Sequence, residues 1–303
     1  MVELKNHLLF FMERYVFPQD AKETFLDAFD TIFKNQDTAK EFADILEEYN
    51  KNIHCSYQQM IENAIKIGEK LGIHSYTISL LLFIFLSKKL RENYVARGIS
   101  EEIFDNSVND LYYKLIECRL VYGINGTFVA SWFSGFFNMT RFALGRLQFE
   151  IVETTVEATI DGTYFPVGSK AINVHIPRTG TKLSHEDVLN SYRLAAEMFA
   201  DEFEKQPILF CCDSWILDPW LLTVLDSESN IVKFSKDYHT VKTMNCSKEY
   251  IIKVIFNQIY TDVVPVLPED TSLHKAYANR IKSDEELHVA LGMFVYKDGA
   301  IIN

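Results

Sequence analysis

Residues 171–203 read AINVHIPRTGTKLSHEDVLNSYRLAAEMFADEF, and the succession of elements in this stretch decides the fold. Residues 171–176 form a short apolar run with β-branched side chains, which predicts a strand. Pro177 ends that strand, because proline has no N–H for a central ladder. Ser184 is a suitable helix N-cap, and apolar residues then recur at helical spacing as far as Phe203. The stretch therefore predicts a strand, a loop and a helix.

The loop between this strand and this helix has the composition of an anion site. Free N–H groups of the first helical turn and the positive end of the helix dipole would point into it. An arginine there would suit bidentate phosphate contact. One glycine is much less specific than a Walker loop, so spacing alone favours an ordinary connection with solvated cations. The residues expected to bind an anion are Arg178, Thr179, Gly180, Thr181, Lys182 and Ser184.

Composition and charge restrict the class of protein. The chain has 303 residues, 48% of them hydrophobic and 24% charged, which is a globular composition sufficient for two domains or one large one. The formal net charge of -12 argues against a nucleic-acid binder and against attraction to anionic membranes. The longest apolar run, residues 79–87, is too short to span a bilayer. We therefore expect a soluble protein with no nucleic-acid or membrane partner.

The cysteines and histidines indicate neither a disulfide framework nor a metal site. Five cysteines are scattered without a C-x-x-C motif, which is typical of reduced thiols in the cytoplasm. His54 and Cys55 form an isolated pair, and His185 begins a helix whose acids suit the dipole. The N-terminal segment carries acids among its apolar residues and resembles no signal peptide. We expect a cytoplasmic protein without a bound metal.

The pattern of apolar residues divides the chain into two parts. Residues 1 to about 118 follow helical spacing, and the fifth helix, 74–94, is apolar on most faces and therefore expected at the centre. The second part alternates between strands and helices, with a hairpin signal at Asp161–Gly162. Residues 230–234 and 238–244 also resemble strands. We predict a helical domain at 1–140 and an α+β domain with a mixed sheet at 141–303.

Several short runs resemble a known family. They are residues 123–132, ALGRLQFE at 143–150, HIP with its glycine at 175–180, the CDSWIL run with its proline at 212–219, SNI with its phenylalanine at 229–234, and LPEDTSLHKA at 267–276. Together they are similar, over nearly the full length, to a bacterial family of N-acyltransferases with an all-helical N-terminal domain and a GNAT-like C-terminal domain. The strand–loop–helix unit also resembles the acyl-CoA site of GNAT acyltransferases.

This resemblance implies an acyl-CoA-dependent N-acyltransferase. The loop amides would bind the CoA pyrophosphate, and the strands flanking it would separate to admit pantetheine. Acetyl-CoA, or another acyl-CoA, would be the co-substrate, with no permanently bound cofactor, and a small-molecule amine or a peptide would accept the acyl group. The loop departs from the usual GNAT pattern, because Lys182 occupies the position of the second small residue.

Within that resemblance, two residues are candidate general bases. Glu150 lies on the first long strand of the sheet and His175 on the strand before the loop, so both border the expected cleft. The alternatives are a solvated strand residue for Glu150 and a hydrogen-bonded core histidine for His175, and the pattern alone favours both.

The end of the next buried strand supplies further candidates. Cys212 would act as a nucleophile, Asp213 as a base and Ser214 as a hydrogen-bond donor to the thioester. The alternative, which the pattern favours, is a pair of packed thiols followed by a residue that caps the helix at Pro219. Tyr192 and Tyr238 are candidate acids toward the leaving thiolate, although most tyrosines simply pack.

Two alternative functions compete with the enzyme. The missing small residue of the loop suits a degenerate module that binds CoA or a nucleotide without turnover. The aromatic content and the apolar residues 80–86 of the helical part suit a docking or dimerisation unit, so an oligomer is also considered.

Overall fold

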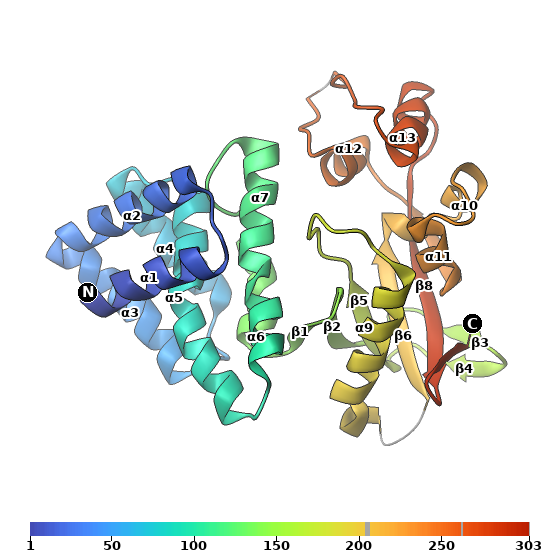
Figure 1. Ribbon diagram of the computed structural model, residues 1–303, viewed down its shortest axis with the longest axis horizontal. Coiled ribbons are helices and arrows are strands. Elements are labelled where there is room, and N and C mark those ends of the chain that lie inside the picture. Colours follow the sequence, from blue (N-terminus) through green and yellow to red (C-terminus); the bar gives the residue numbers. More distant parts are fainter. Residues whose placement is uncertain (204–206, 262, 303) are drawn as a thin grey trace. The chain divides into compact units, whose positions relative to one another are not determined.

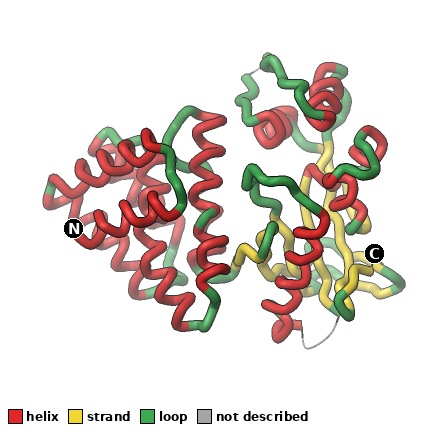
Figure 2. Tube along the Cα trace, in the orientation of Figure 1, coloured by secondary structure: helices red, strands yellow, loops and turns green. Residues whose placement is uncertain are grey.

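The computed structural model describes residues 1–203, 207–261 and 263–302 (Figures 1 and 2). The chain forms two compact units, Met1–Phe142 and Ala143–Asn303. The limits expected from the sequence, 1–140 and 141–303, differ from this division only at Arg141 and Phe142.

The first unit is helical, as predicted. Side chains of Asn35, Ser56 and Ser100 accept N–H groups from the first turns of α3, α4 and α6 and so mark where these helices begin. A 3-10 turn, Ala130–Phe133, precedes the last short helix. The helices are α1 (Val2–Arg14), α2 (Gln19–Lys34), α3 (Gln36–Lys51), α4 (Tyr57–Leu71), α5 (Ser75–Ala96), α6 (Glu101–Val108), α7 (Asp110–Tyr122) and α8 (Ser134–Phe137).

Helix α5 is the central element of this unit. All residues from Thr77 to Ser87 are buried, and α5 packs against α1, α2, α3, α4, α6 and α7. A helix that is apolar around its whole circumference is stable only when neighbours cover every face. The prediction of a central fifth helix is therefore confirmed.

The second unit is a mixed sheet with helices. Its strands are β1 (Arg141–Leu144), β2 (Leu147–Glu153), β3 (Ala158–Ile160), β4 (Thr163–Phe165), β5 (Lys170–His175), β6 (Ile208–Ser214), β7 (His239–Asn245), β8 (His288–Lys297) and β9 (Ala300–Ile302). Its helices are α9 (His185–Met198), α10 (Leu221–Val224), α11 (Asn230–Lys236), α12 (Lys248–Phe256) and α13 (Ser272–Lys282), with 3-10 turns at Ala200–Phe203 and Trp215–Leu217. The predicted α+β class is confirmed.

Strand order in the main sheet is β1-β2-β5-β6-β8-β7, with β9 beside β8. The β5–β6 pair is parallel, whereas β2–β5, β6–β8 and β7–β8 are antiparallel. The helix α9 connects β5 to β6 and crosses in front of the sheet in Figure 1. This crossover is the connection that a parallel pair requires.

The two faces of the sheet are covered differently. On one face, Phe149, Phe210 and Phe294 pack with Tyr192 of α9. On the other, Ala158 and Ile160 of the β3–β4 hairpin join a cluster with strand residues that include Leu209 and Met293. Strand side chains alternate between faces, so the two residues of each neighbouring pair face opposite environments.

One strand prediction differs from the structure. Residues 230–234 form α11 instead of a strand, because Ser229 caps the first turn by accepting the Val232 N–H. The β-branched residues Ile231 and Val232 suggested a strand, but their burial against neighbouring helices favours the helix. Residues 163–165 follow the expected turn at Asp161–Gly162 and pair antiparallel with β3 in a separate two-stranded sheet.

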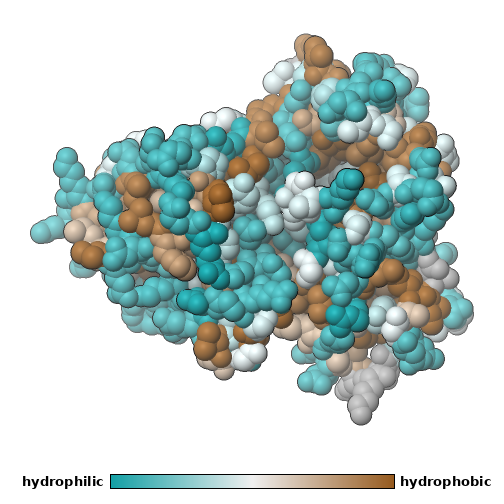
Figure 3. Space-filling view, in the orientation of Figure 1, coloured by the Kyte–Doolittle hydropathy of each residue, from teal (hydrophilic) through white to brown (hydrophobic). Residues whose placement is uncertain are grey.

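The visible surface of both units is mainly hydrophilic, with hydrophobic side chains gathered near α12 and α13 (Figure 3). Val263 and Val266 in the segment between these helices are 74% and 93% exposed. Among the described helices, none combines the length and apolar character that a bilayer crossing requires.

Candidate functional site

The parallel strands β5 and β6 pair only over a short distance. Ile172 lies opposite Phe210 and Asn173 opposite Cys211, and within the described part of the sheet the pairing of these two strands ends at Asn173 and Cys211. Beyond that point β5 remains paired with β2 as far as His175, while β6 remains paired with β8 as far as Ser214. The C-terminal ends of β5 and β6 therefore separate in the middle of the sheet, as the resemblance to GNAT enzymes implied.

A polar cluster lies where the strands part. Nε2 of His175 is 2.7 Å from Oε1 of Glu150 and 3.2 Å from Nδ2 of Asn173. The register places Glu150 opposite Asn173, so its side chain reaches His175 diagonally across the β2–β5 pair. Cys211 lies on the same face, with Sγ 3.8 Å from Oδ1 of Asn173.

Neither Glu150 nor His175 fits the non-catalytic alternative that the sequence pattern favoured. Glu150 is not a solvated strand residue, because its side chain is only 18% exposed and contacts the imidazole. His175 is hydrogen-bonded but is not a core histidine, because its side chain is 21% exposed. Their partner Asn173 was not identified from the sequence, since the contact depends on strand register.

Arg146, which the sequence pattern does not single out, holds the loop after β5. Its guanidinium donates to the carbonyl oxygens of Pro177 at 3.0 Å, and of Thr181 and Lys182 at 3.4 Å. A trans peptide unit directs its C=O and N–H in opposite directions. The N–H groups of residues 178, 182 and 183 therefore point away from this guanidinium.

The loop itself is open around its glycine. Gly180 has φ +77°, and a Cβ placed there would meet nothing within 4 Å. Thr179 and Thr181 hydroxyls lie 2.7 Å apart, and Thr179 also accepts the Thr181 N–H. Ser184 caps α9 by accepting the Asp187 N–H, as predicted. The first turn of α9 thus directs its N-terminal end, with the positive end of the helix dipole, toward the loop.

The two loop cations behave differently from each other. Arg178 donates to Oδ1 of Asn257 and to the carbonyl of Val254, at the C-terminal end of α12. Its guanidinium thus joins the loop to α12, a contact that the predicted phosphate role does not include. Lys182 is exposed on the loop.

The candidate residues of β6 are divided between the two faces of the sheet. Asp213 shares the face of Cys211 and lies at the exposed strand end, where partial burial raises the pKa of its carboxyl. Cys212 lies on the opposite face under α9, is 1% exposed, and burial raises the pKa of its thiol well above the ordinary value. Ser214 accepts the Ile216 N–H and begins a 3-10 turn. This geometry therefore supports a packing role for Cys212 and a capping role for Ser214 over the proposed catalytic roles.

The two candidate tyrosine acids belong to the same buried face. The hydroxyls of Tyr192 and Tyr238 are 3.0 Å apart, and both side chains are below 10% exposure. Burial raises the pKa of both phenols. Aromatic packing beneath α9 is the role that this geometry supports.

Among residues 1–203, 207–261 and 263–302, no three His, Cys, Asp or Glu side chains are placed to hold a metal ion.

Comparison with protein families identifies the class of the chain. The family model described as GNAT-like C-terminal domain matches residues 142–294, just over half of the chain. The chain belongs to this family. A second model, described as N-acyltransferase N-terminal domain, matches residues 7–139. The resemblance inferred from the short sequence runs is thereby confirmed.

Solved structures share the fold. A crystal structure of an acyltransferase in complex with decanoyl-CoA and teicoplanin matches with a TM-score of 0.71 and 20% identity, over 94% of this chain and 86% of that chain. An acyltransferase mutant in complex with octanoyl-CoA matches with a TM-score of 0.71 and 19% identity, over 93% and 85%. Comparison with curated proteins finds no relative of significant similarity.

Proposed function

We propose that this protein is an acyl-CoA-dependent N-acyltransferase that moves an acyl group directly from the CoA thioester to an amine. The observation that carries the proposal is the position of the Glu150–His175 pair beside the parting ends of β5 and β6. The family to which the chain belongs, with its N-acyltransferase and GNAT-like domains, supports the same activity.

The residues of the loop fit the diphosphate of CoA. Amides of residues 178, 182 and 183 point away from Arg146, and the first turn of α9 adds further N–H groups and a positive dipole. The open space around Gly180 allows a phosphate to approach the backbone closely. Pantetheine would then extend between β5 and β6 toward His175.

His175 would act as the general base. With the proton on Nε2, where the Glu150 carboxylate would accept it, Nδ1 would be the proton acceptor. The amine nitrogen attacks the thioester carbonyl, its proton passes to Nδ1, and the C–S bond breaks to release CoA as thiolate. The imidazolium then returns a proton to the thiolate, so the products are an amide and a thiol. Glu150 stabilises the imidazolium that forms between these steps.

Activity assays with a defined set of acyl-CoA donors and a defined set of acceptors would identify the two substrates. Acetyl-CoA, octanoyl-CoA and decanoyl-CoA cover the expected donor and the donors seen in the related structures. Primary amines and short peptides form the acceptor set, since the first of those structures also holds teicoplanin. We expect stoichiometric CoA release together with an amide product identified by mass spectrometry. Absence of CoA binding by calorimetry would contradict the proposal.

A matched pair of glycine variants tests the CoA loop. Gly180 and Gly162 both have positive φ, +77° and +73°, and an added Cβ meets nothing within 4 Å at either. Gly180→Ala and Gly162→Ala therefore carry similar backbone strain, but only the first would obstruct the diphosphate. We expect about a tenfold rise in the Kd for CoA with Gly180→Ala, equivalent to about 1.4 kcal/mol, and little change with Gly162→Ala. An equal change in the Kd for CoA in both variants would show that CoA does not bind at this loop.

Binding without turnover is the second candidate function. The observation in its favour is that Arg178 contacts α12 and that Lys182 replaces the second small residue of the usual loop. CoA binding that Gly180→Ala weakens, without amide formation from any donor and acceptor in the sets, would favour this candidate over the enzyme.

A further inference from the structure

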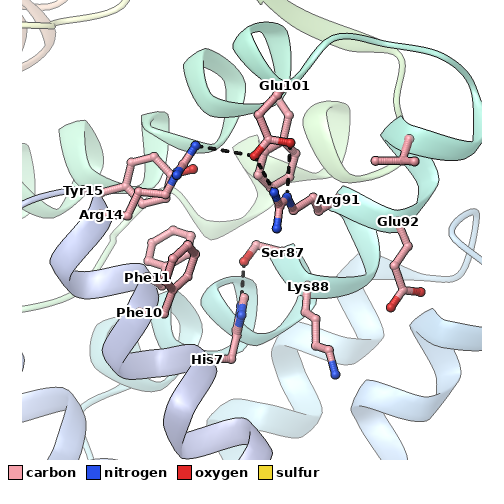
Figure 4. Close-up of a pocket in the computed structure, with 12 residues that line it drawn as sticks. His7, Phe10, Phe11, Arg14, Tyr15, Ser87, Lys88, Arg91, Glu92 and Glu101 are labelled. Atoms are coloured by element: carbon pink, nitrogen blue, oxygen red, sulfur yellow. Dashed lines mark hydrogen bonds and ion pairs between the residues drawn. The ribbon is translucent and has the colours of Figure 1, made fainter.

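An open cavity of about 490 Å³ lies at the surface of the helical unit, between α1, α5 and the start of α6 (Figure 4). Its volume falls within the range of small-molecule sites in proteins. None of the sequence runs that carry the family resemblance includes its lining, and the proposed acyl transfer does not use it.

The walls of the cavity are mainly apolar. Phe11, Tyr15 and Phe104 are buried in its lining, at 2%, 8% and 5% exposure. Phe10 of α1 and Val95 of α5 also line it but remain 53% and 68% exposed. Exposed apolar side chains beside a cavity give a ligand surface to cover, whereas scattered single ones need no explanation.

Cationic groups stand at the edge of this apolar space. Lys88, Arg91 and Arg14 line the cavity together with the carboxylates of Glu92 and Glu101, and Figure 4 shows Glu101 bridging the two arginines. Lys88 pairs outside the cavity with Glu3, whose side chain is 80% exposed. Exposed ion pairs of this kind contribute little net stability. A ligand carboxylate can therefore replace the Glu3 carboxylate on Lys88 at low cost.

A polar pair lies beside these cations. Nε2 of His7 is 2.9 Å from the carbonyl of Ile84 and 3.0 Å from Oγ of Ser87, and Ser87 donates to the same carbonyl at 2.6 Å. Burial lowers the pKa of His7, and the nearby charges of Lys88 and Arg91 lower it further. The imidazole is therefore neutral near pH 7, and the positive charge at this end comes from Lys88 and Arg91.

We propose that this cavity binds an aliphatic carboxylate, with its chain against Phe10, Phe11 and Val95 and its carboxylate at Lys88 and Arg91. The apolar walls select a chain, and the cations at one edge select an anion over a cation of the same length. The site belongs to the helical unit alone, so the inference does not depend on the proposed acyl transfer.

Calorimetry on the full chain tests this site with three probes of equal chain length: sodium decanoate, decan-1-ol and decyltrimethylammonium bromide, each below its micelle concentration. We expect saturable binding of one decanoate, with the alcohol at least about tenfold weaker and the cation without binding. CoA at saturating concentration should leave the decanoate Kd unchanged. Equal affinity for the alcohol, or displacement of decanoate by CoA, would overturn the proposal.

Exposed variants avoid unfolding the unit. Val95→Glu places a carboxylate on the apolar wall, and Arg91→Ala removes one cation; both positions are on the exposed side of α5. We expect decanoate binding to weaken about tenfold or more with each. Arg97→Ala, an exposed arginine at the end of the same helix but outside the lining, is the matched control and should change nothing.

Glu3→Gln supplies a test in the opposite direction. Removing the carboxylate that pairs with Lys88 should tighten decanoate binding by about twofold to threefold, because the ligand no longer competes for that ammonium. Weaker binding in Glu3→Gln, or a decanoate Kd unaffected by Val95→Glu, would contradict the proposed position. A dimer in sedimentation that Val95→Glu dissociates would show that a second copy covers this surface instead.

Discussion

The two faces of the sheet in the second unit use the same strands for opposite purposes. Under α9, Phe210 and Phe294 stack with ring centroids 4.8 Å apart, and Cys212 packs among aromatic rings. On the other face, Glu150 and His175 form a polar pair beside the parting strands. One step along a strand therefore separates a residue that stabilises the fold from one placed for chemistry.

The largest effect should come from the polar face. His175→Ala removes the proposed base without disturbing the packed face, so we expect kcat to fall about 10²–10⁴-fold with the unfolding midpoint nearly unchanged. Steady-state kinetics and urea denaturation of the same preparation measure both quantities. Full activity in this variant would show that the polar face is not the site of proton transfer.

A large effect of the opposite kind should come from the packed face. Phe210→Ala leaves a cavity beneath α9, because Phe210 is fully buried against Tyr192 and Phe294. We expect a loss of about 3–5 kcal/mol in the free energy of unfolding. In the molecules that remain folded, kcat should stay within a few-fold of the parent. A large fall in kcat without a loss of stability would contradict the assignment of this face to stability alone.

Cys212→Ser sharpens the same comparison at one position. The hydroxyl would be buried where the thiol packs, so we expect a loss of about 1–3 kcal/mol in stability. Cys211→Ser, on the polar face, is the matched control. Loss of turnover in Cys212→Ser with normal stability would support the earlier hypothesis that Cys212 is a nucleophile.

Glu150→Gln should reduce turnover moderately. The amide keeps a hydrogen-bonding group at 2.7 Å from the imidazole but removes the charge that stabilises imidazolium. We expect kcat to fall about tenfold, or about 1.4 kcal/mol, with the KM for acyl-CoA little changed. An unchanged kcat would make Glu150 a structural residue only.

Asp213→Asn should have the smallest effect, and on stability. Partial burial raises the pKa of this carboxyl in the folded state. Its stabilising contribution is therefore present below the ordinary Asp pKa and is lost as pH rises through the folded pKa. We expect the variant to be slightly more stable than the parent at pH 7, and the difference to vanish under acidic conditions. Urea midpoints at the two pH values measure this; a less stable variant at pH 7 would contradict it.

Patterns local in sequence were predictable. The largely apolar residues 79–87 predicted a helix at the centre of the unit, and Ser184 marks the start of α9 by its own side chain. The hairpin at Asp161–Gly162 follows from turn chemistry. In each case the physical signal lies within a few residues of the structure that it determines.

Contacts that depend on register were not predictable. The Glu150–His175 pair joins residues 25 positions apart, and only the β2–β5 alignment brings them together. Arg178 was expected on a phosphate but contacts α12, because helix placement decides what a long side chain can reach. Residues 230–234 resembled a strand until their tertiary neighbours were known.

The position of Arg146 has a practical consequence for engineering this loop. One planar cation turns three carbonyls toward itself, and a lysine, with its single ammonium, cannot reproduce that fork. Grafting residues 177–184 onto another scaffold without Arg146 would therefore transfer the amino-acid sequence of the loop but not its conformation. Anyone redesigning the cofactor preference should keep this upstream arginine before changing a single residue of the segment it shapes.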